Sequence, residues 1–447
     1  MEVRVDLLKG NILKALMALS IPIMATSLLQ MMYNMTDMIW IGRVGSNSVA
    51  AVGAAGMFVN LANGISAFLR VGGQVNVAQS YGANNQNKAA TYSRHALQIG
   101  FILSVLYGLF LCFGNGLCID FFKFGNGVVI QEARTYLFVM GMFIFLPIIN
   151  PICTAVITAT GNSKTPFKIN TVGLITNLIL DPVLIFGFHM GVLGAAIATV
   201  VAQLIVFLLY VMYMKKDEKV FSSMKLAHSF DKNYIRDIVR IGLPATVQGV
   251  MFNGISMTIG RIIASWGETA VAVQKVGIQV ESISYMAADG FASATNSFIG
   301  QNYGASQMDR AKKGYSTALM VMMMWGLITT GVLVFLPEYI FQIFITEADV
   351  IPLGVDYLRI LGYSQLFMCM EILTAGAFSA YGQTLIPSIV SIVFTSMRIP
   401  GAFLLGKTAL GLNGVWWSIS LSSVVKGLLL VSLFMVFMKK MDKEKAR

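Results

Sequence analysis

The apolar residues of the chain fall into twelve long stretches that are separated by short polar breaks. A membrane core about 30 Å thick needs roughly 20 apolar residues per helix, and the stretches are of about that length or longer. Most breaks contain Gly, Asn or Pro, which end helices and form turns. We therefore predict twelve transmembrane helices, at residues 14–41, 51–79, 93–114, 134–158, 166–187, 191–213, 236–264, 270–299, 314–336, 355–379, 385–405 and 411–438.

The composition excludes most other classes of protein. Only 12% of the 447 residues are charged, whereas soluble proteins carry about 25%, and the mean hydropathy is +0.72. A soluble enzyme, a disordered chain and a disulfide scaffold are therefore excluded. The four cysteines and three histidines are scattered, so we expect neither a metal centre nor a cofactor. The expected fold is an all-α integral membrane protein.

The basic residues indicate how the helices are oriented. The formal net charge is +11, and 22 lysines and arginines lie on the side of the two termini, against four in the opposite loops. Because cytoplasmic loops carry the excess of Lys and Arg, we place both termini in the cytoplasm. The positive charge therefore indicates how the protein is oriented in the membrane and favours contact with anionic membrane lipid. It does not predict a nucleic-acid partner.

The second half of the chain repeats the first. Residues 79–83 (QSYGA) recur as 301–305 (QNYGA), 222 positions later, and the glycines at 191 and 194 recur at 411 and 414. Each half holds six predicted helices, so the repeats are parallel, as in transporters whose site lies between the halves. The predicted organisation is an N-terminal lobe (1–213), a cytoplasmic linker (214–235) and a C-terminal lobe (236–447).

Two acidic residues inside the predicted helices are the main functional candidates, because a buried charge costs about 2.5–3.5 kcal/mol. Asp37 follows Tyr33 by four residues, and Asp181 follows Asn177 by four, so each pair shares a helix face. Carboxylate and amide oxygens suit a small cation such as Na⁺. Alternatively a desolvated carboxylate carries a proton, or these groups merely bridge neighbouring helices.

Prolines and the repeat refine this prediction. Pro22 predicts a kink in the first helix, and Pro182 disfavours helical geometry at Asp181. In the second half, Ile259 takes the place of Asp37 and Arg398 that of Asn177. A cation site confined to the first half is the simplest interpretation.

Other polar and flexible residues are less specific. Further ionisable groups inside helices either take part in coupling or form structural ion pairs; these secondary candidates are Glu281, Glu371 and Arg398. Amide and methionine side chains either line an adaptable substrate cavity or fill space between helices and lipid. The cavity candidates are Gln30, Met31, Asn34, Met35, Asn60, Asn63, Gln248, Asn253 and Met257.

Several segments together resemble the multidrug and toxic compound extrusion (MATE) transporter family, most closely its prokaryotic branch named for DNA-damage-inducible protein F. They include Ile21-Pro22, Tyr33, Asp37, residues 41–45 (IGRVG), residues 300–305 (GQNYGA) and Asn177 with Asp181-Pro182. The resemblance implies a twelve-helix, two-lobe antiporter of a bacterial or archaeal cell membrane. It would export organic cations or other amphipathic compounds in exchange for Na⁺ or H⁺. The implied cation site is Asp37, Asn177, Asp181 and Thr199, with Pro22 and Tyr33 as switch elements.

Antiport has three alternatives, each with its own requirement on the sequence. A lipid-linked precursor flippase of the same superfamily would need a basic cavity, and Arg70 and Arg398 keep this alternative open. A channel or sensory protein would need a selectivity ring or a soluble signalling domain. A membrane enzyme would need a cluster such as paired histidines, so we expect no enzyme. Since both lobes lie in one chain, a monomer suffices.

Overall fold

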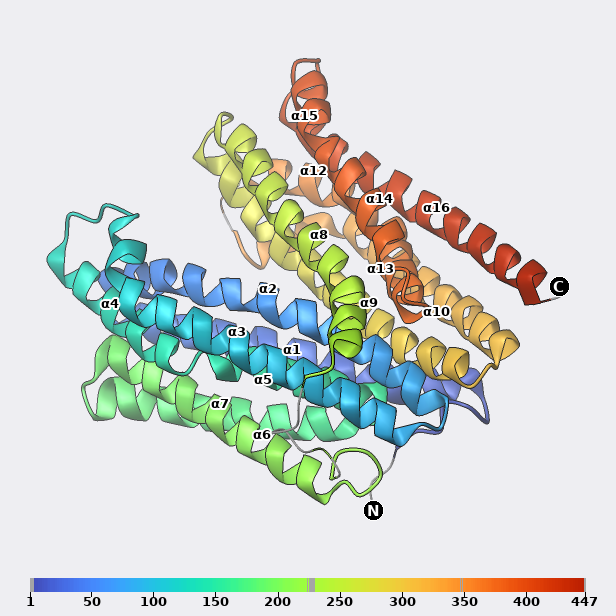
Figure 1. Ribbon diagram of the computed structural model, residues 1–447. Helices are drawn as coiled ribbons and strands as arrows, with labels where there is room; N and C mark the ends of the chain where they lie inside the picture. The colour runs from blue at the N-terminus through green and yellow to red at the C-terminus, as the bar shows by residue number, and fades with distance from the viewer. Residues whose placement is uncertain (1–3, 223, 225–229, 346, 348, 446–447) are drawn as a thin grey trace. The chain divides into compact units, whose positions relative to one another are not determined.

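The computed structural model describes residues 4–222, 224, 230–345, 347 and 349–445, and within these the side chains of all but residues 34, 46, 444 and 445. The regular structure of this part of the chain is entirely helical (Figure 1). Its elements are α1 (Ile12–Val44), α2 (Ser46–Gly82), α3 (Gln86–Asp120), α4 (Gly127–Met142), α5 (Phe145–Ala159), α6 (Lys164–Pro182), the π-helix η1 (Val183–Gly187), α7 (Gly191–Lys216), α8 (Lys232–Ala264), α9 (Glu268–Gly304), α10 (Met308–Phe335), α11 (Pro337–Gln342), α12 (Ile351–Gly362), α13 (Gln365–Ala380), α14 (Leu385–Ser396), α15 (Arg398–Gly406) and α16 (Leu412–Lys445).

Each of the twelve predicted segments lies on one helix or on two consecutive helices. Among the described residues, eight helical spans are long and apolar enough to cross a membrane. Two further spans are helix pairs, α4 with α5 and α12 with α13, bent by 46° and 45°. Helices α8 and α9, with 33 and 37 residues, are also long enough to cross a membrane but contain more polar and charged residues. The prediction of an all-α, multi-pass membrane protein is confirmed.

The chain divides into two compact units. The N-terminal unit contains Ala25–Thr246 and the short segment that ends at Asp6, and the C-terminal unit contains Leu7–Met24 and Val247–Arg447. Helices α1 and α8 therefore begin in one unit and end in the other. Both changes of unit occur two residues after a proline inside the helix, Pro22 or Pro244. Residues 223 and 225–229 of the predicted linker lie outside the described part.

Each unit also binds the segment that precedes the helix that begins in it: residues 7–10 before α1 in the C-terminal unit, and Asp231 before α8 in the N-terminal unit. In the C-terminal unit, Arg310 donates hydrogen bonds to three backbone carbonyls within residues 7–10, at 2.7–3.1 Å. Asn302 donates a fourth, to the carbonyl of Leu7, at 3.0 Å. In the N-terminal unit, the backbone N–H of Asp231 donates to Nε2 of His95 at 3.0 Å. Polar side chains of α9 and α10 thus hold the segment that leads into α1, and a side chain of α3 holds the segment that leads into α8.

The repeat extends to the backbone of the turns. Helices α2 and α9 both have 37 residues, and both repeats contain a bent helix pair at the same place. Left-handed backbone, which favours glycine because it has no Cβ, recurs at matching positions. The matching pairs are Gly45 with Gly267, Gly161 (φ 87°) with Gly382 (φ 75°), and Gly191 (φ 52°) with Gly411 (φ 54°).

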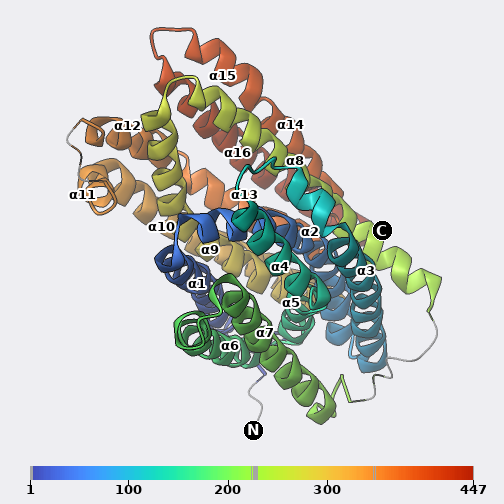
Figure 2. The same cartoon turned by 90° about the vertical axis from the view of Figure 1, so that its left-hand side faces the viewer.

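Close packing of α6 against α7 positions polar groups inside the N-terminal unit. The two helices lie side by side in both views (Figures 1 and 2). Gly194, in the first turn of α7, allows this approach, since a Cβ there would lie 2.8 Å from the carbonyl carbon and oxygen of Leu184 in η1. The end of α6 is thereby brought against the beginning of α7.

Candidate cation site

Helix α1 supplies the first two candidate groups. Tyr33 and Asp37 are four residues apart in a continuous helix, so they share a face, as their spacing predicts. The Tyr33 hydroxyl and one Asp37 carboxylate oxygen, Oδ1, are buried. Asp37 Oδ1 has no hydrogen-bond partner among the described residues, whereas the Tyr33 hydroxyl interacts with the side chain of Thr199. The Asp37 oxygen is therefore available to a further ligand.

Helix α6 supplies the second pair, Asn177 and Asp181, which are 1% and 0% exposed. The Asn177 amide donates to Oδ1 of Asp181 at 3.1 Å. Within the described chain, Asn177 Oδ1 and Asp181 Oδ2 have no partner. An amide oxygen and a carboxylate oxygen are thus both left without a donor in a buried position.

The predicted loss of helical geometry at Asp181 was wrong. Helix α6 continues through Asp181 and Pro182 and passes directly into the π-helix η1. Proline has no N–H, so one hydrogen bond of the α-helical ladder is missing. The chain accommodates the loss by widening its turn instead of leaving the helix, and single π-turns are frequent at functional sites.

The two pairs converge in the N-terminal unit. The carboxylates of Asp37 and Asp181 interact electrostatically with each other and with the Tyr33 hydroxyl. Thr199, on α7, is buried and lies beside Tyr33. The structure therefore brings together all four residues of the predicted cation site and the predicted switch residue Tyr33. Pro22 lies on α1 in the segment that belongs to the C-terminal unit.

One member of this group, Tyr136 on α4, was not predicted from the sequence. It is buried and interacts electrostatically with both Asp37 and Asp181. A signal was present, because Tyr136 is repeated 221 residues later as Tyr357. Tyr357 in turn lies beside an acidic residue, Glu281. Both repeats thus keep a tyrosine next to a buried carboxyl group.

The charges of Asp37 and Asp181 are not balanced by basic side chains. No ion pair in the described part of the chain involves either residue. Buried charges are costly unless they are paired or neutralised. The available ligands are all oxygens, from two carboxylates, an amide and hydroxyls, which fits Na⁺ or H⁺. In the described residues no group of three or more His, Cys, Asp and Glu gathers as at a transition-metal site.

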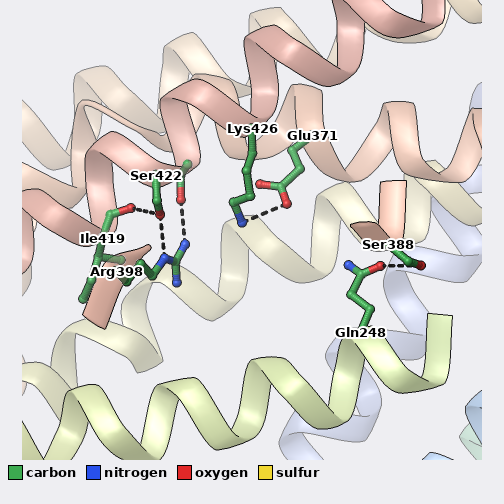
Figure 3. Close-up of polar contacts among 8 residues, drawn as sticks. Gln248, Glu371, Ser388, Arg398, Ile419, Ser422 and Lys426 are labelled. Atoms are coloured by element: carbon green, nitrogen blue, oxygen red, sulfur yellow. Dashed lines mark hydrogen bonds and ion pairs between the residues drawn. The ribbon is translucent and has the colours of Figure 1, made fainter. Parts of the chain in front are cut away.

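The C-terminal unit contains a second buried polar cluster, in which charges are paired (Figure 3). Lys426 Nζ lies 2.9 Å from Oε1 of Glu371. Arg398 donates from Nε to Ser422 Oγ at 2.6 Å and from a terminal nitrogen to Ser423 Oγ at 3.0 Å. Of the three secondary candidates, Glu371 is thus part of an ion pair and Arg398 is anchored by hydroxyl groups.

Glu281, the third secondary candidate, belongs to the same cluster. It lies beside Tyr357 and interacts electrostatically with Arg398, which also interacts with Glu371. The cluster therefore contains two acidic and two basic side chains. It balances its own charge, in contrast to the acidic pair in the N-terminal unit.

The predicted cavity residues differ in exposure. In the N-terminal unit Met31 is half-buried, whereas Gln30, Met35, Asn60 and Asn63 are exposed. In the C-terminal unit Gln248 is half-buried and accepts a hydrogen bond from Ser388 at 3.1 Å (Figure 3). Asn253 and Met257 are exposed there. The side chain of Asn34 lies outside the described part.

Comparison with known proteins places this arrangement in a family. The MatE family profile matches residues 22–183 and 244–404, one match in each repeat. The chain belongs to the MatE family. MatE proteins are transporters and not enzymes, so the resemblance noted from the sequence is confirmed.

Relatives with names and structures match nearly the whole of this MatE chain. The "Probable multidrug resistance protein NorM" of Thermotoga maritima is 26% identical, with 91% of this chain and 88% of the relative covered. The multidrug export protein MepA of Staphylococcus haemolyticus is 24% identical, with 96% and 94% covered. A structure described as MATE in the bent conformation gives a TM-score of 0.90 at 25% identity, with 99% of each chain covered. A MOP-superfamily transporter from Pyrococcus furiosus, whose binding pocket is described as having reverse polarity, gives a TM-score of 0.87 at 25% identity, with 98% of each covered.

Proposed function

We propose that this MatE protein is a secondary active antiporter that exports organic cations and other amphipathic compounds in exchange for Na⁺ or H⁺. One observation carries the proposal: Asp37 and Asp181 are neighbours with buried, unpartnered oxygens and without a basic partner in the described chain. Relatives named as multidrug resistance and export proteins support the choice of substrate class.

In the proposed mechanism the coupling cation neutralises Asp37 and Asp181 when the site opens outward. Without the cation the two carboxylates are negative and close together, which favours a conformation that accepts a cationic substrate from the cytoplasm. Alternating access follows if cation binding bends α1 near Pro22, where a backbone hydrogen bond is missing. Because one chain supplies both units, we propose that a monomer is sufficient.

The membrane potential drives this exchange when net positive charge moves inward, as when one cation enters for an uncharged compound or two cations enter for one organic cation. One positive charge that enters down 100 mV releases about 2.3 kcal/mol. At about 1.4 kcal/mol per tenfold change, this supports a concentration ratio of order 50 for the exported compound.

Exposed amide side chains support a polar path for the substrate. Gln30, Asn60 and Asn63 are exposed on helices that are otherwise long and apolar. Polar groups within membrane-spanning helices usually face a water-filled space or another helix and not lipid. We propose that these residues contact the substrate.

The alternative of a lipid-linked precursor flippase receives less support. Such a flippase needs basic groups that are free to bind a pyrophosphate. Arg398 already contacts two serine hydroxyls, and Lys426 already pairs with Glu371. The buried basic groups of the C-terminal unit are therefore occupied within the protein.

The test uses the full-length protein in proteoliposomes loaded with ethidium, a fluorescent organic cation. Ethidium export is measured under an inward Na⁺ gradient and, separately, under an inward H⁺ gradient. Asp37→Asn and Asp181→Asn should each abolish gradient-driven export. Asp120→Asn is the matched control, because Asp120 is an exposed acid of the same unit that pairs with Arg134. Export by the double variant at the wild-type rate would refute the proposed coupling site.

A further inference from the structure

A groove on the surface of the C-terminal unit is independent of the proposed cation site. It has a volume of about 610 Å³ and lies between α10 and α16, within the range of roughly 300–1,000 Å³ that is typical of ligand pockets. Its walls are apolar over most of their length and its two lysines are Lys312 and Lys439. Leu319, Met323, Leu327 and Met435 are among the wall residues.

The floor of the groove is closed and apolar. The rings of Tyr315 and Phe434 pack with their centres 4.2 Å apart. The Tyr315 hydroxyl lies 3.0 Å from Oγ1 of Thr374, on α13 behind the groove. The one polar atom of this ring is therefore turned into the protein, and the ring presents carbon to the groove.

The length of the groove matches one leaflet of a membrane. Lys312 and Leu327 are 15 residues apart on α10, which at 1.5 Å per residue corresponds to about 22 Å. Half of a bilayer about 40–45 Å thick, head groups included, is about 20–22 Å. A groove that begins at the level of the head groups at Lys312 therefore reaches roughly the middle of the membrane near Leu327.

The positive charge lies at one end of the groove. Lys312 forms an ion pair with Asp442, which joins the beginning of α10 to the end of α16. Lys439 is exposed at the same end, because it precedes Asp442 by less than one helical turn. It forms no ion pair with any described residue. The carboxylate of Asp442 offsets Lys312, so Lys439 supplies the net positive charge at the groove.

We propose that this groove binds one anionic phospholipid, with its phosphate on Lys439 and an acyl chain along Leu319, Met323 and Leu327. Methionine side chains adapt to an irregular chain because they are unbranched and flexible. In the predicted orientation the basic end lies at the cytoplasmic leaflet, where anionic lipids attract Lys and Arg. The occupant is a lipid and not free phosphate, because most of the groove surface is carbon.

Native mass spectrometry of the purified full-length protein tests this proposal. The probes are phosphatidylglycerol and phosphatidylcholine with identical acyl chains, and inorganic phosphate is the third arm. Lys439→Gln removes the charge, Met323→Trp fills the groove, and Lys164→Gln is the matched control at an exposed lysine of the other unit. The wild-type protein should retain phosphatidylglycerol in preference to phosphatidylcholine. Inorganic phosphate should not displace the bound phosphatidylglycerol.

The two variants should fail in different ways. Lys439→Gln should weaken phosphatidylglycerol binding about fivefold, the change that corresponds to the loss of about 1 kcal/mol per basic residue, and leave phosphatidylcholine unchanged. Met323→Trp should weaken the binding of both lipids, while Lys164→Gln should change neither. The proposal would be overturned if Lys439→Gln retained phosphatidylglycerol as the wild type does, or if the Lys164→Gln control lost it equally. Displacement of the lipid by phosphate alone would also overturn it.

Discussion

Replacing Lys426 by Met should leave the Glu371 carboxylate buried without its partner. The ammonium and carboxylate are 2.9 Å apart, and their side chains are only 4% and 11% exposed. Breaking a buried ion pair by removing one member costs about 3–5 kcal/mol, because the remaining charge is uncompensated. For a domain of 150–250 residues, 1 kcal/mol lowers the unfolding midpoint by about 2–4 °C, so we expect a fall of roughly 6–20 °C.

Buried cysteines provide an assay that distinguishes the two units. Cys369 is 0% exposed in the C-terminal unit, and Cys153 is 2% exposed in the N-terminal unit. Two proteins that each retain one of these cysteines can be heated in detergent with a thiol-reactive dye, which reports when that cysteine becomes accessible. Lys426→Met should lower the midpoint measured at Cys369 more than the midpoint measured at Cys153.

The double variant separates the ion pair from simple loss of packing. Replacing both members of a buried pair by apolar residues of similar volume is often neutral, so Lys426→Met with Glu371→Met should recover most of the lost stability. Arg398 retains Glu281 as an electrostatic partner in this variant. The stabilising role of the ion pair would be refuted if the single variant melted within a degree of the wild type. It would also be refuted if the double variant melted no higher than the single one.

Three further predictions concern the N-terminal unit. Gly194→Ala should weaken the packing of α6 on α7, because the new Cβ would lie 2.8 Å from backbone atoms of η1. Gly53→Ala, in the same unit, meets nothing within 4 Å and is the control; dye accessibility at Cys153 measures the difference, and equal midpoints would contradict the packing. Arg4→Gln should speed tryptic cleavage beside Asp217 at least tenfold, or about 1.4 kcal/mol, because these two nearly buried side chains pair at 2.6 Å; an unchanged cleavage rate would count against this role. Burial alone would lower the pKa of Arg4, but the Asp217 carboxylate raises it above its usual value, so the pair should persist throughout the pH range of the assay. Tyr136→Phe should raise the coupling-ion concentration for half-maximal export about fivefold, the equivalent of one hydrogen bond; an unchanged value would exclude the hydroxyl from the site.

The helices could be predicted from the sequence because the length of an apolar stretch depends only on consecutive residues. The bent pairs were different: residues 134–158 read as one apolar stretch, although α4 ends at Met142 and α5 begins at Phe145. An apolar sequence does not reveal this bend, because hydrogen bonds at the break, such as that from the Leu146 N–H to the carbonyl of Phe143, are made by the backbone itself. Pro182 gave the opposite error, since its effect on the chain was absorbed by a wider helical turn.

The candidate site was predictable to the extent that its residues share a helix face. Asp37 and Asp181 were found because acids inside apolar helices are costly, and each has a polar partner four residues away. Tyr136 was missed because a tyrosine in an apolar helix is ordinary, and its neighbours come from α1 and α6. An ion pair was one of the two alternatives predicted for Glu371, but its partner could not be predicted, because Lys426 is 55 residues away in sequence.

The exchange of helix beginnings between the units has a consequence for assembly. If the chain were cut in the linker, the first fragment would carry residues 7–24 without the Arg310 and Asn302 contacts that hold their leading segment. The second would carry residues 232–246 without the unit into which they pack. Neither fragment would be a self-contained folding unit, so the two should assemble only when they are produced together. A single-repeat ancestor built on this plan would have been an intertwined dimer, and fusing two copies would have made that mutual dependence permanent.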